Sequence, residues 1–214
     1  MGSWGWTLAA LGIIGLVVGI AFFDAKQVTA PVTIPQSVAE VATDEWSTGN
    51  ESARVTLIEY GDFQCPACRF FFELLRQLKT EFPPQELRVI YRHFPLDNIH
   101  SNARAAAHAA EAAGEQGKFF PMHDLLYERQ PEWSELDDPT DVFATYAEDL
   151  GLDLALFRET LDRPETKEAV QADVRSGNVA QVTATPTFIL NGKKIDNPNS
   201  YDTLRTLVRT ELGQ

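Results

Sequence analysis

Residues 55–68, VTLIEYGDFQCPAC, decide the fold of this chain. The segment 54–60 is rich in β-branched residues and alternates in polarity, which predicts a strand. After the motif Cys65-Pro66-Ala67-Cys68, apolar side chains recur at the spacing of a helix that buries one face, and Pro83-Pro84 ends that helix. Both cysteines therefore lie where a strand turns into a helix. The apolar positions of the predicted helix are Phe71, Leu74, Leu75, Leu78 and Phe82.

A second strand is predicted at residues 87–93, LRVIYRH. Strand, helix and strand with a crossover of this length form a βαβ unit, in which the two strands are parallel. From about residue 101 to 180 the signals are helical, with helix starts at Asp138-Pro139, Asp153 and Pro164. The sequence thus predicts an α/β thioredoxin fold with a helical insertion, at about residues 97–162, between the βαβ and ββα halves.

The ββα half is predicted from three adjoining signals. Asn191-Gly192 favours a type I′ turn, which joins strands at 187–190 and 193–195 into a hairpin. Ser200 then caps an amphipathic helix that continues to about residue 212.

Composition excludes some functions. The 214 residues carry 31 acidic and 18 basic side chains, a formal net charge of −13, so we expect no nucleic-acid partner, because a phosphate backbone requires a basic surface. The chain has two cysteines, three positions apart. A disulfide that closes so short a loop removes little entropy from the unfolded chain, so we interpret these cysteines as reactive rather than structural.

The N-terminal segment predicts a membrane anchor. Residues 4–23 contain no charged side chain and, as a helix, would span ~30 Å, the thickness of a hydrocarbon core. We therefore predict a transmembrane signal-anchor at 1–23, a linker at 24–52, and a folded domain at 53–214. The alternative is a signal peptide cleaved after Val28-Thr29-Ala30, but Pro31 follows that site and no basic residue precedes the apolar run.

The cysteine motif has the features of a redox site. Pro66 suits the first position of a helix, which places Cys65 at the helix N-terminus, where free N–H groups stabilise a thiolate. Cys68, one turn into the helix, is then able to resolve a mixed disulfide. The alternative is half of a zinc site. It requires two more ligands, and no two histidines have zinc-ligand spacing, so we expect no metal and interpret them as structural or solvent-facing; they are His93, His100, His108 and His123.

Two further features lie near this motif. Glu59 shares a strand face with Val55 and Leu57, so we expect it to be buried behind the cysteines, with a raised pKa, and able to exchange protons with Cys68. The alternative is an acid at the strand end that reaches solvent. Thr185-Pro186 begins the third strand, where proline has no ladder hydrogen bond to lose. If that peptide bond is cis, the Thr185 backbone faces the cysteines and offers an edge to a peptide.

These residues resemble the DsbA family of thiol–disulfide oxidoreductases, and in particular its membrane-anchored branch. The resemblance covers about residues 50–212. It implies a nucleophile at Cys65, a resolving thiol at Cys68, a buried acid at Glu59 and a cis-proline at Pro186, preceded by Thr185. Besides 55–68, it is carried by RHFPL at 92–96, AAEAAGEQGKFFPMHDLLY at 109–127 and VTATPTFILNGKKI at 182–195.

One position departs from the founding member of the family. That protein has a histidine where this chain has Ala67, and the histidine stabilises the thiolate. We therefore expect a less strongly oxidising site.

The leading functional hypothesis is a dithiol oxidase without a cofactor, which donates the Cys65–Cys68 disulfide to reduced exported proteins outside the cytoplasmic membrane. Its expected redox partner is a membrane quinone-linked reoxidase, DsbB-like or VKOR-like, and the chain is expected to be a monomer. A reductase or isomerase is the first alternative, although residues 24–52 are too few for a dimerisation domain. A non-catalytic adaptor that binds client proteins is the second.

Overall fold

The computed structural model describes residues 34–42 and 45–214. The predicted membrane anchor at 1–23 lies outside these residues. Within the described part, no helix combines the length and the apolar composition needed to cross a membrane.

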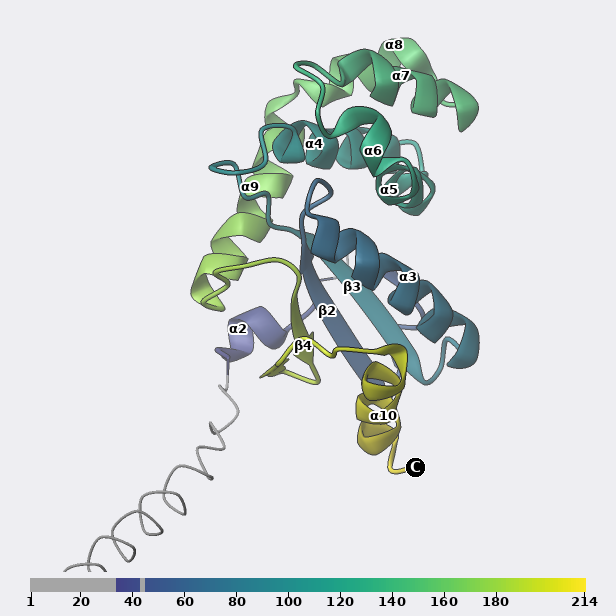
Figure 1. Cartoon of the computed structure of the whole chain (residues 1–214), viewed down its shortest axis with the longest axis vertical. Coiled ribbons are helices and arrows are strands. Elements are labelled where there is room, and N and C mark those ends of the chain that lie inside the picture. The colour runs from purple at the N-terminus through teal and green to yellow at the C-terminus, as the bar shows by residue number, and fades with distance from the viewer. Residues whose placement is uncertain (1–33, 43–44) are drawn as a thin grey trace, which may run out of the picture. The chain divides into compact units, whose positions relative to one another are not determined.

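A mixed sheet of five strands forms the centre of the domain, in the order β1-β3-β2-β4-β5 (Figure 1). Strand β2 pairs in parallel with β3, as the βαβ pattern predicts, and antiparallel with β4. The strands are β1 Ser47–Thr48, β2 Val55–Gly61, β3 Leu87–His93, β4 Thr187–Leu190 and β5 Lys193–Ile195. The turn between β4 and β5 is at Asn191-Gly192, where both residues have the positive φ that a type I′ turn requires.

Helices cover both faces of the sheet (Figure 1). Helices α3 and α10 pack on one face through an apolar cluster that includes Leu57 and Leu78, whereas α2 and α9 pack on the other, against Ile58 and Ile90. The helices are α2 Gln36–Ala39, α3 Pro66–Glu81, α4 Ala103–Gly114, α5 Phe119–Glu128, α6 Gln130–Trp133, α7 Thr140–Asp149, α8 Leu154–Leu161, α9 Pro164–Val179 and α10 Tyr201–Leu212.

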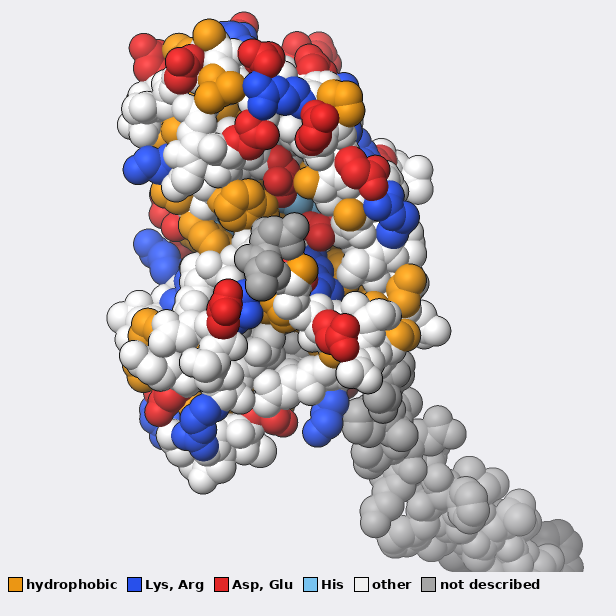
Figure 2. Space-filling view, turned by 180° about the vertical axis from the view of Figure 1, so that it is seen from behind, with side chains coloured by type: hydrophobic (Ala, Val, Ile, Leu, Met, Phe, Trp, Pro, Cys, Tyr) orange, Lys and Arg blue, Asp and Glu red, His pale blue; other side chains and the backbone are white. Residues whose placement is uncertain are grey.

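Helices α4 to α8 are inserted between β3 and α9, and lie over the end of the sheet at which α3 begins (Figure 1). They have their own apolar core, which includes Trp133 and Phe157, and this core is continuous with Phe63, Cys65 and Cys68. The insertion is therefore packed on the cysteine motif itself. Figure 2 shows acidic and basic side chains interspersed over these helices, where ion pairs such as Arg163–Glu115 form.

The sequence places two helix starts correctly and one a residue early. Asp153 caps α8 by accepting a hydrogen bond from the Leu156 N–H, and Pro164 is the first residue of α9. Helix α7 begins at Thr140 rather than at Pro139, because the Asp138 carboxylate forms a turn by accepting the Thr140 N–H at 2.9 Å.

The predicted linker at 24–52 is wrong for the residues that the structure describes. Ile34 and Val38 are 5% and 2% exposed and belong to the core on the α9 side of the sheet. Trp46 stacks on Phe119, with ring centroids 4.5 Å apart, and Ser47–Thr48 pairs with β3. The folded domain therefore begins before residue 53. The apolar residues of this N-terminal segment show no strong periodicity, because separate short contacts attach the segment to the domain and no single amphipathic element does.

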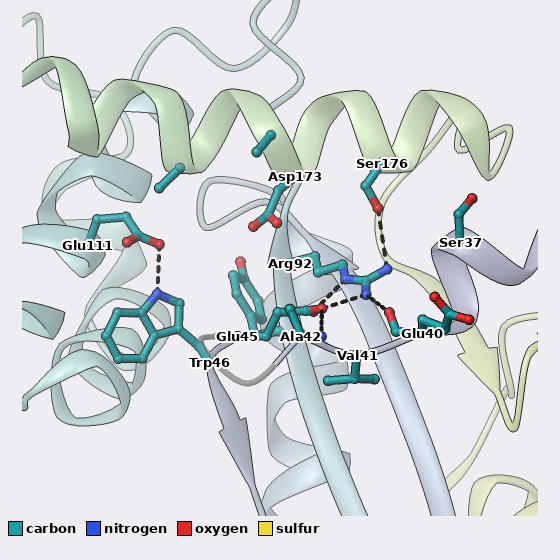
Figure 3. Close-up of a pocket in the computed structure, with 13 residues that line it drawn as sticks. Ser37, Glu40, Val41, Ala42, Glu45, Trp46, Arg92, Glu111, Asp173 and Ser176 are labelled. Carbon is teal, nitrogen blue, oxygen red and sulfur yellow. Dashed lines mark hydrogen bonds and ion pairs between the residues drawn. The ribbon is translucent and has the colours of Figure 1, made fainter. Parts of the chain in front are cut away.

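A buried ion pair fixes this segment to the sheet (Figure 3). The Arg92 guanidinium, on β3, donates to both carboxylate oxygens of Glu45, at 2.7 and 2.9 Å. It also donates to the Val38 and Glu40 carbonyls and to the Tyr60 hydroxyl. Burial lowers the pKa of Arg92 and is the largest single effect. Hydrogen bonds to Glu45 act in the opposite direction, and the net result is a raised pKa. The Arg92 side chain is 4% exposed, so loss of Glu45 leaves a buried positive charge without its counterion.

We expect Glu45→Gln to lower the free energy of unfolding by about 3 kcal/mol, the low end of the cost of breaking a buried ion pair, because four neutral acceptors, including the Ser176 hydroxyl, remain on Arg92. Urea denaturation at pH 7 measures this change. Glu51→Gln, an exposed acid of the same segment, is the control and should change stability little. Equal stabilities for the two variants would show that the Glu45–Arg92 ion pair does not stabilise the fold.

Candidate active site

The two cysteines lie at the start of α3, as free thiols. Cys65 is the N-cap residue and Pro66 is the first residue of the helix, which matches the local geometry expected from the sequence. Cys65 is 7% exposed and Cys68 is 0% exposed. Both cysteines are buried, and Cys65 is the less buried of the two.

The two thiols differ in acidity. The Cys68 thiol donates a hydrogen bond to the Cys65 sulfur and, with the backbone N–H groups of Cys68 and Ala67, lowers the pKa of Cys65 to about 5, although burial acts in the opposite direction. Burial raises the pKa of Cys68 well above its ordinary value, and the hydrogen bond to Cys65 adds to this effect. Near neutral pH the pair thus holds one thiolate, on Cys65.

Glu59 is buried on the face of β2 that packs against α3. Its side chain is 2% exposed, and its Oε1 atom has no hydrogen-bond partner. Burial raises the pKa of Glu59 to about 8, against the opposing charge of Lys79. A cavity of about 10 Å³, the size of one water, lies between Glu59, Lys79, Tyr91 and His123. The alternative reading, in which Glu59 reaches solvent, is wrong, because Glu59 is only 2% exposed.

The loop before β4 faces the cysteines. The Thr185-Pro186 peptide bond is cis, which is the geometry that the family resemblance implies. The Cys65 thiol donates to the Thr185 carbonyl oxygen at 3.4 Å. The Thr185 backbone is thus in contact with the more exposed sulfur, at the position where a peptide edge would meet it.

The helical insertion fastens the loop that carries the cysteines. Gln130, at the start of α6, donates to the Phe63 and Cys65 carbonyl oxygens, at 2.6 and 3.1 Å. Gln64 donates to the Ser134 carbonyl oxygen and accepts the Asn102 N–H, both at 2.7 Å. Neither glutamine carries a sequence signal for this role, because the role depends on contacts between segments more than 30 positions apart.

The four histidines do not form a metal site. His93 pairs with Glu111 at 2.9 Å, and His123 with Asp124 at 2.8 Å. Burial lowers the pKa of His108 to about 4. In the described residues no group of three or more His, Cys, Asp or Glu side chains could hold a metal ion. His100 contacts Asp62, next to the cysteine loop.

A hollow of about 670 Å³ lies away from the cysteines (Figure 3). Glu40, Glu45, Glu111 and Asp173 line it, together with Arg92. Glu111 accepts from the Trp46 indole and pairs with His93, and Asp173 accepts the His93 backbone N–H. These contacts join α4, α9 and the N-terminal segment, so the hollow belongs to the supporting structure of the domain.

Comparison with known proteins decides the family, because the thioredoxin family model matches residues 41–210. The chain belongs to the thioredoxin family. The resemblance drawn from the sequence is therefore confirmed at the level of the family, and the match includes part of the segment predicted as a linker.

Solved structures show which thioredoxin fold this is. BdbD from Bacillus subtilis superposes with a TM-score of 0.72 at 22% identity, and covers 86% of this chain and 98% of its own. The α-DsbA1 protein of Wolbachia pipientis superposes with a TM-score of 0.72 at 19% identity, and covers 81% of this chain and 93% of its own. This thioredoxin-family chain thus has the fold of DsbA-like thiol–disulfide oxidoreductases.

Curated relatives match over the same domain. Na⁺/H⁺ antiporter NhaA 1 of Salinispora arenicola is 41% identical over 165 residues, which are 77% of this chain and 24% of that protein. The corresponding protein of Herminiimonas arsenicoxydans is 36% identical over 154 residues, 23% of its length. The chain spans about a quarter of the length of these relatives, so their titles describe larger proteins that contain a similar domain.

We expect Glu59→Gln to raise the free energy of unfolding of the reduced protein above pH 8 by several kcal/mol, since each unit of pKa shift is worth about 1.4 kcal/mol. The folded pKa of about 8 lies above the ordinary value of 4.5, so the folded state holds a proton that the unfolded state releases between these values. Stability conferred by this proton is present below pH 4.5 and is lost as pH rises toward 8. Glutamine has no such proton, so the gain should vanish below pH 4.5.

Urea denaturation of the reduced protein from pH 4 to pH 9 measures this difference. Glu148→Gln, an exposed acid on α7 with no ion pair among the described residues, is the matched control and should give a flat difference. A flat difference for Glu59→Gln as well would show that folding does not raise the pKa of Glu59.

Proposed function

We propose that this chain is a thiol–disulfide oxidase that donates the Cys65–Cys68 disulfide to exported proteins. The observation that carries the proposal is the asymmetry of the pair, in which Cys65 has a pKa of about 5 and Cys68 a raised one. A stabilised Cys65 thiolate favours the reduced form of the pair, and that makes its disulfide an oxidant.

The proposed reaction runs in two exchanges. A client thiolate attacks the Cys65 sulfur, the Cys65–Cys68 bond breaks, and Cys68 leaves as a thiolate that takes a proton. A second client thiolate then attacks the client sulfur of the mixed disulfide, and Cys65 leaves as a thiolate. The client loses two electrons and gains a disulfide, and the Cys65–Cys68 pair is reduced.

Glu59 supplies the proton in this scheme. Its pKa of about 8 keeps it protonated near neutral pH, and it lies close enough for its charge to raise the pKa of Cys68. Glu59→Gln should accordingly slow exchange. Thr185, with its carbonyl oxygen at the Cys65 thiol, and cis-Pro186 form the proposed edge for the client peptide.

The geometry of the two sulfur atoms predicts which one meets the client. In Cys68→Ser, a mixed disulfide between Cys65 and client proteins should accumulate, because the resolving thiol is absent, and should disappear when reductant is added. Non-reducing gels and mass spectrometry of the trapped adducts measure this. Accumulation in Cys65→Ser and none in Cys68→Ser would reverse the assignment.

The reduction potential tests the direction of exchange. We expect a value on the order of −150 to −200 mV, between roughly −120 mV for DsbA and about −270 mV for thioredoxin. Ala67 gives Cys65 no side-chain hydrogen bond, and one charge-assisted bond of about 1.5–3 kcal/mol is worth roughly 30–60 mV. Ala67→His should therefore raise the potential and the thiolate fraction.

Equilibration with glutathione, followed by thiol trapping and mass measurement, gives this potential. A value near that of thioredoxin would replace the oxidase by a reductase. No exchange at all in the parent protein would favour a non-catalytic adaptor.

We also propose that the domain works at the outer face of a membrane, tethered by residues 1–23, as a monomer that a quinone-linked reoxidase of the DsbB-like or VKOR-like kind reoxidises. The uncharged run at 4–23 supports the tether. The relatives titled Na⁺/H⁺ antiporter contain a similar domain, which supports a place beside a membrane.

Fractionation tests the tether. The protein should remain with membranes and be cleaved by protease added to spheroplasts. A soluble mature protein that begins near Pro31 would show that the segment is a cleaved signal.

A further inference from the structure

Asp62 is the residue that contacts both cysteines through its backbone. It follows β2 directly and is 2% exposed. Its carbonyl oxygen accepts the Cys65 N–H at 3.1 Å, and its own N–H donates to the Cys68 sulfur at 3.5 Å. The position of this one peptide segment thus sets the surroundings of both sulfur atoms.

The Asp62 side chain is held on three sides. Oδ1 accepts the Gln64 N–H at 2.8 Å, which closes a turn inside the loop. Oδ2 accepts the Leu96 N–H at 2.9 Å and pairs with His100 Nδ1 at 2.7 Å. Because the carboxylate is completely buried, it needs these donors to offset its lost hydration.

His100 is the one side chain that binds this carboxylate among the described residues. An ionised carboxylate only accepts hydrogen bonds, so Nδ1 of His100 carries the proton in this pair. The ring is 16% exposed and lines a hollow of about 410 Å³ that Gln64 and Pro66 also line. His100 therefore lies beside the cysteine motif and makes no hydrogen bond to either sulfur among the described residues, which is the place of a supporting group.

We infer that Asp62 and His100 are a positioning pair for the departing Cys68 sulfur. When a client thiolate attacks Cys65, the Cys65–Cys68 bond breaks and its electron pair goes to Cys68, which becomes a thiolate in a buried site. The Asp62 N–H donates to that sulfur and stabilises the developing charge. The His100 contact holds the Asp62 carboxylate, and thereby the loop, so that the N–H stays on Cys68.

This role differs from that of Glu59. Glu59 is proposed to give the leaving thiolate a proton, whereas the Asp62 N–H stabilises the thiolate while its charge forms and keeps its own proton. The N–H of Asp62 lowers the pKa of Cys68, against the larger effect of burial. A buried thiolate needs such a donor, because no water can reach a sulfur that is 0% exposed.

The test is the rate at which dithiothreitol in excess reduces the oxidised full-length protein at pH 7, followed by thiol trapping and mass spectrometry. His100→Phe keeps a ring and removes the donor, so exchange should slow by about tenfold, the scale of one lost hydrogen bond to a charged group. His100→Asn restores an N–H donor and should recover most of the rate. His108→Phe is the matched control, because His108 is a half-buried histidine on α4 whose buried Nε2 has no partner, and its rate should equal that of the parent.

A second measurement separates positioning from support of the fold. Urea denaturation of each variant, oxidised and reduced, gives its stability. If His100→Phe loses stability equally in both redox states and exchanges at the parent rate, or if His108→Phe is slowed as much, the inference is overturned. If His100→Phe does not fold, the exchange rate of His100→Leu is compared with that of His100→Asn instead. Equal rates for these two variants overturn the inference.

The inference rests on the proposed roles of Cys65 and Cys68, and the two can fail separately. A parent protein that dithiothreitol does not reduce would contradict the proposed function. A parent that reacts at Cys65, with a His100→Phe variant that matches its rate, would contradict the positioning pair alone.

Discussion

The parallel pairing of β2 with β3 is the constraint on which the rest of the structure depends. Two parallel neighbours require a crossover, and here α3 makes it, so the chain must leave β2, turn, and begin a helix above the end of the sheet. The residues in that turn come to lie at a helix N-terminus. Cys65 is one of them, and the partial positive charge of its position follows from the topology before any side chain is considered.

Burial then gives the two cysteines different chemistry. The helical insertion covers the turn through Gln130 and Gln64, and its core is continuous with Cys68. Cys65 keeps a small exposure of 7% and contacts the Thr185 carbonyl oxygen. The insertion therefore does more than add a surface, because its core contributes to the burial that separates Cys68, which is 0% exposed, from Cys65, which is 7% exposed.

The buried ionisable side chains of the domain differ in how they are paired. Arg92 is matched by Glu45, and Asp62 by His100 and backbone donors. Glu59 lies beside a site with room for about one water, and its Oε1 has no partner. A buried carboxyl without a counterion in contact keeps its proton, and that property is the one that the proposed proton donor requires.

The sequence by itself determined the elements and the reactive pair. Alternation in 54–60, helical spacing after Cys68 and Asn191-Gly192 each report local backbone preferences, so β2, α3 and the β4–β5 hairpin could be predicted, and so could the burial of Glu59 in line with Val55 and Leu57. The tertiary structure alone decided what residues 34–52 do and which residues hold the cysteine loop. Glu45 with Arg92, and Asp62 with His100, are 47 and 38 positions apart, and neither pair has a periodic signal. Local patterns report how one segment folds, whereas a buried ion pair between segments exists only once the fold has brought them together.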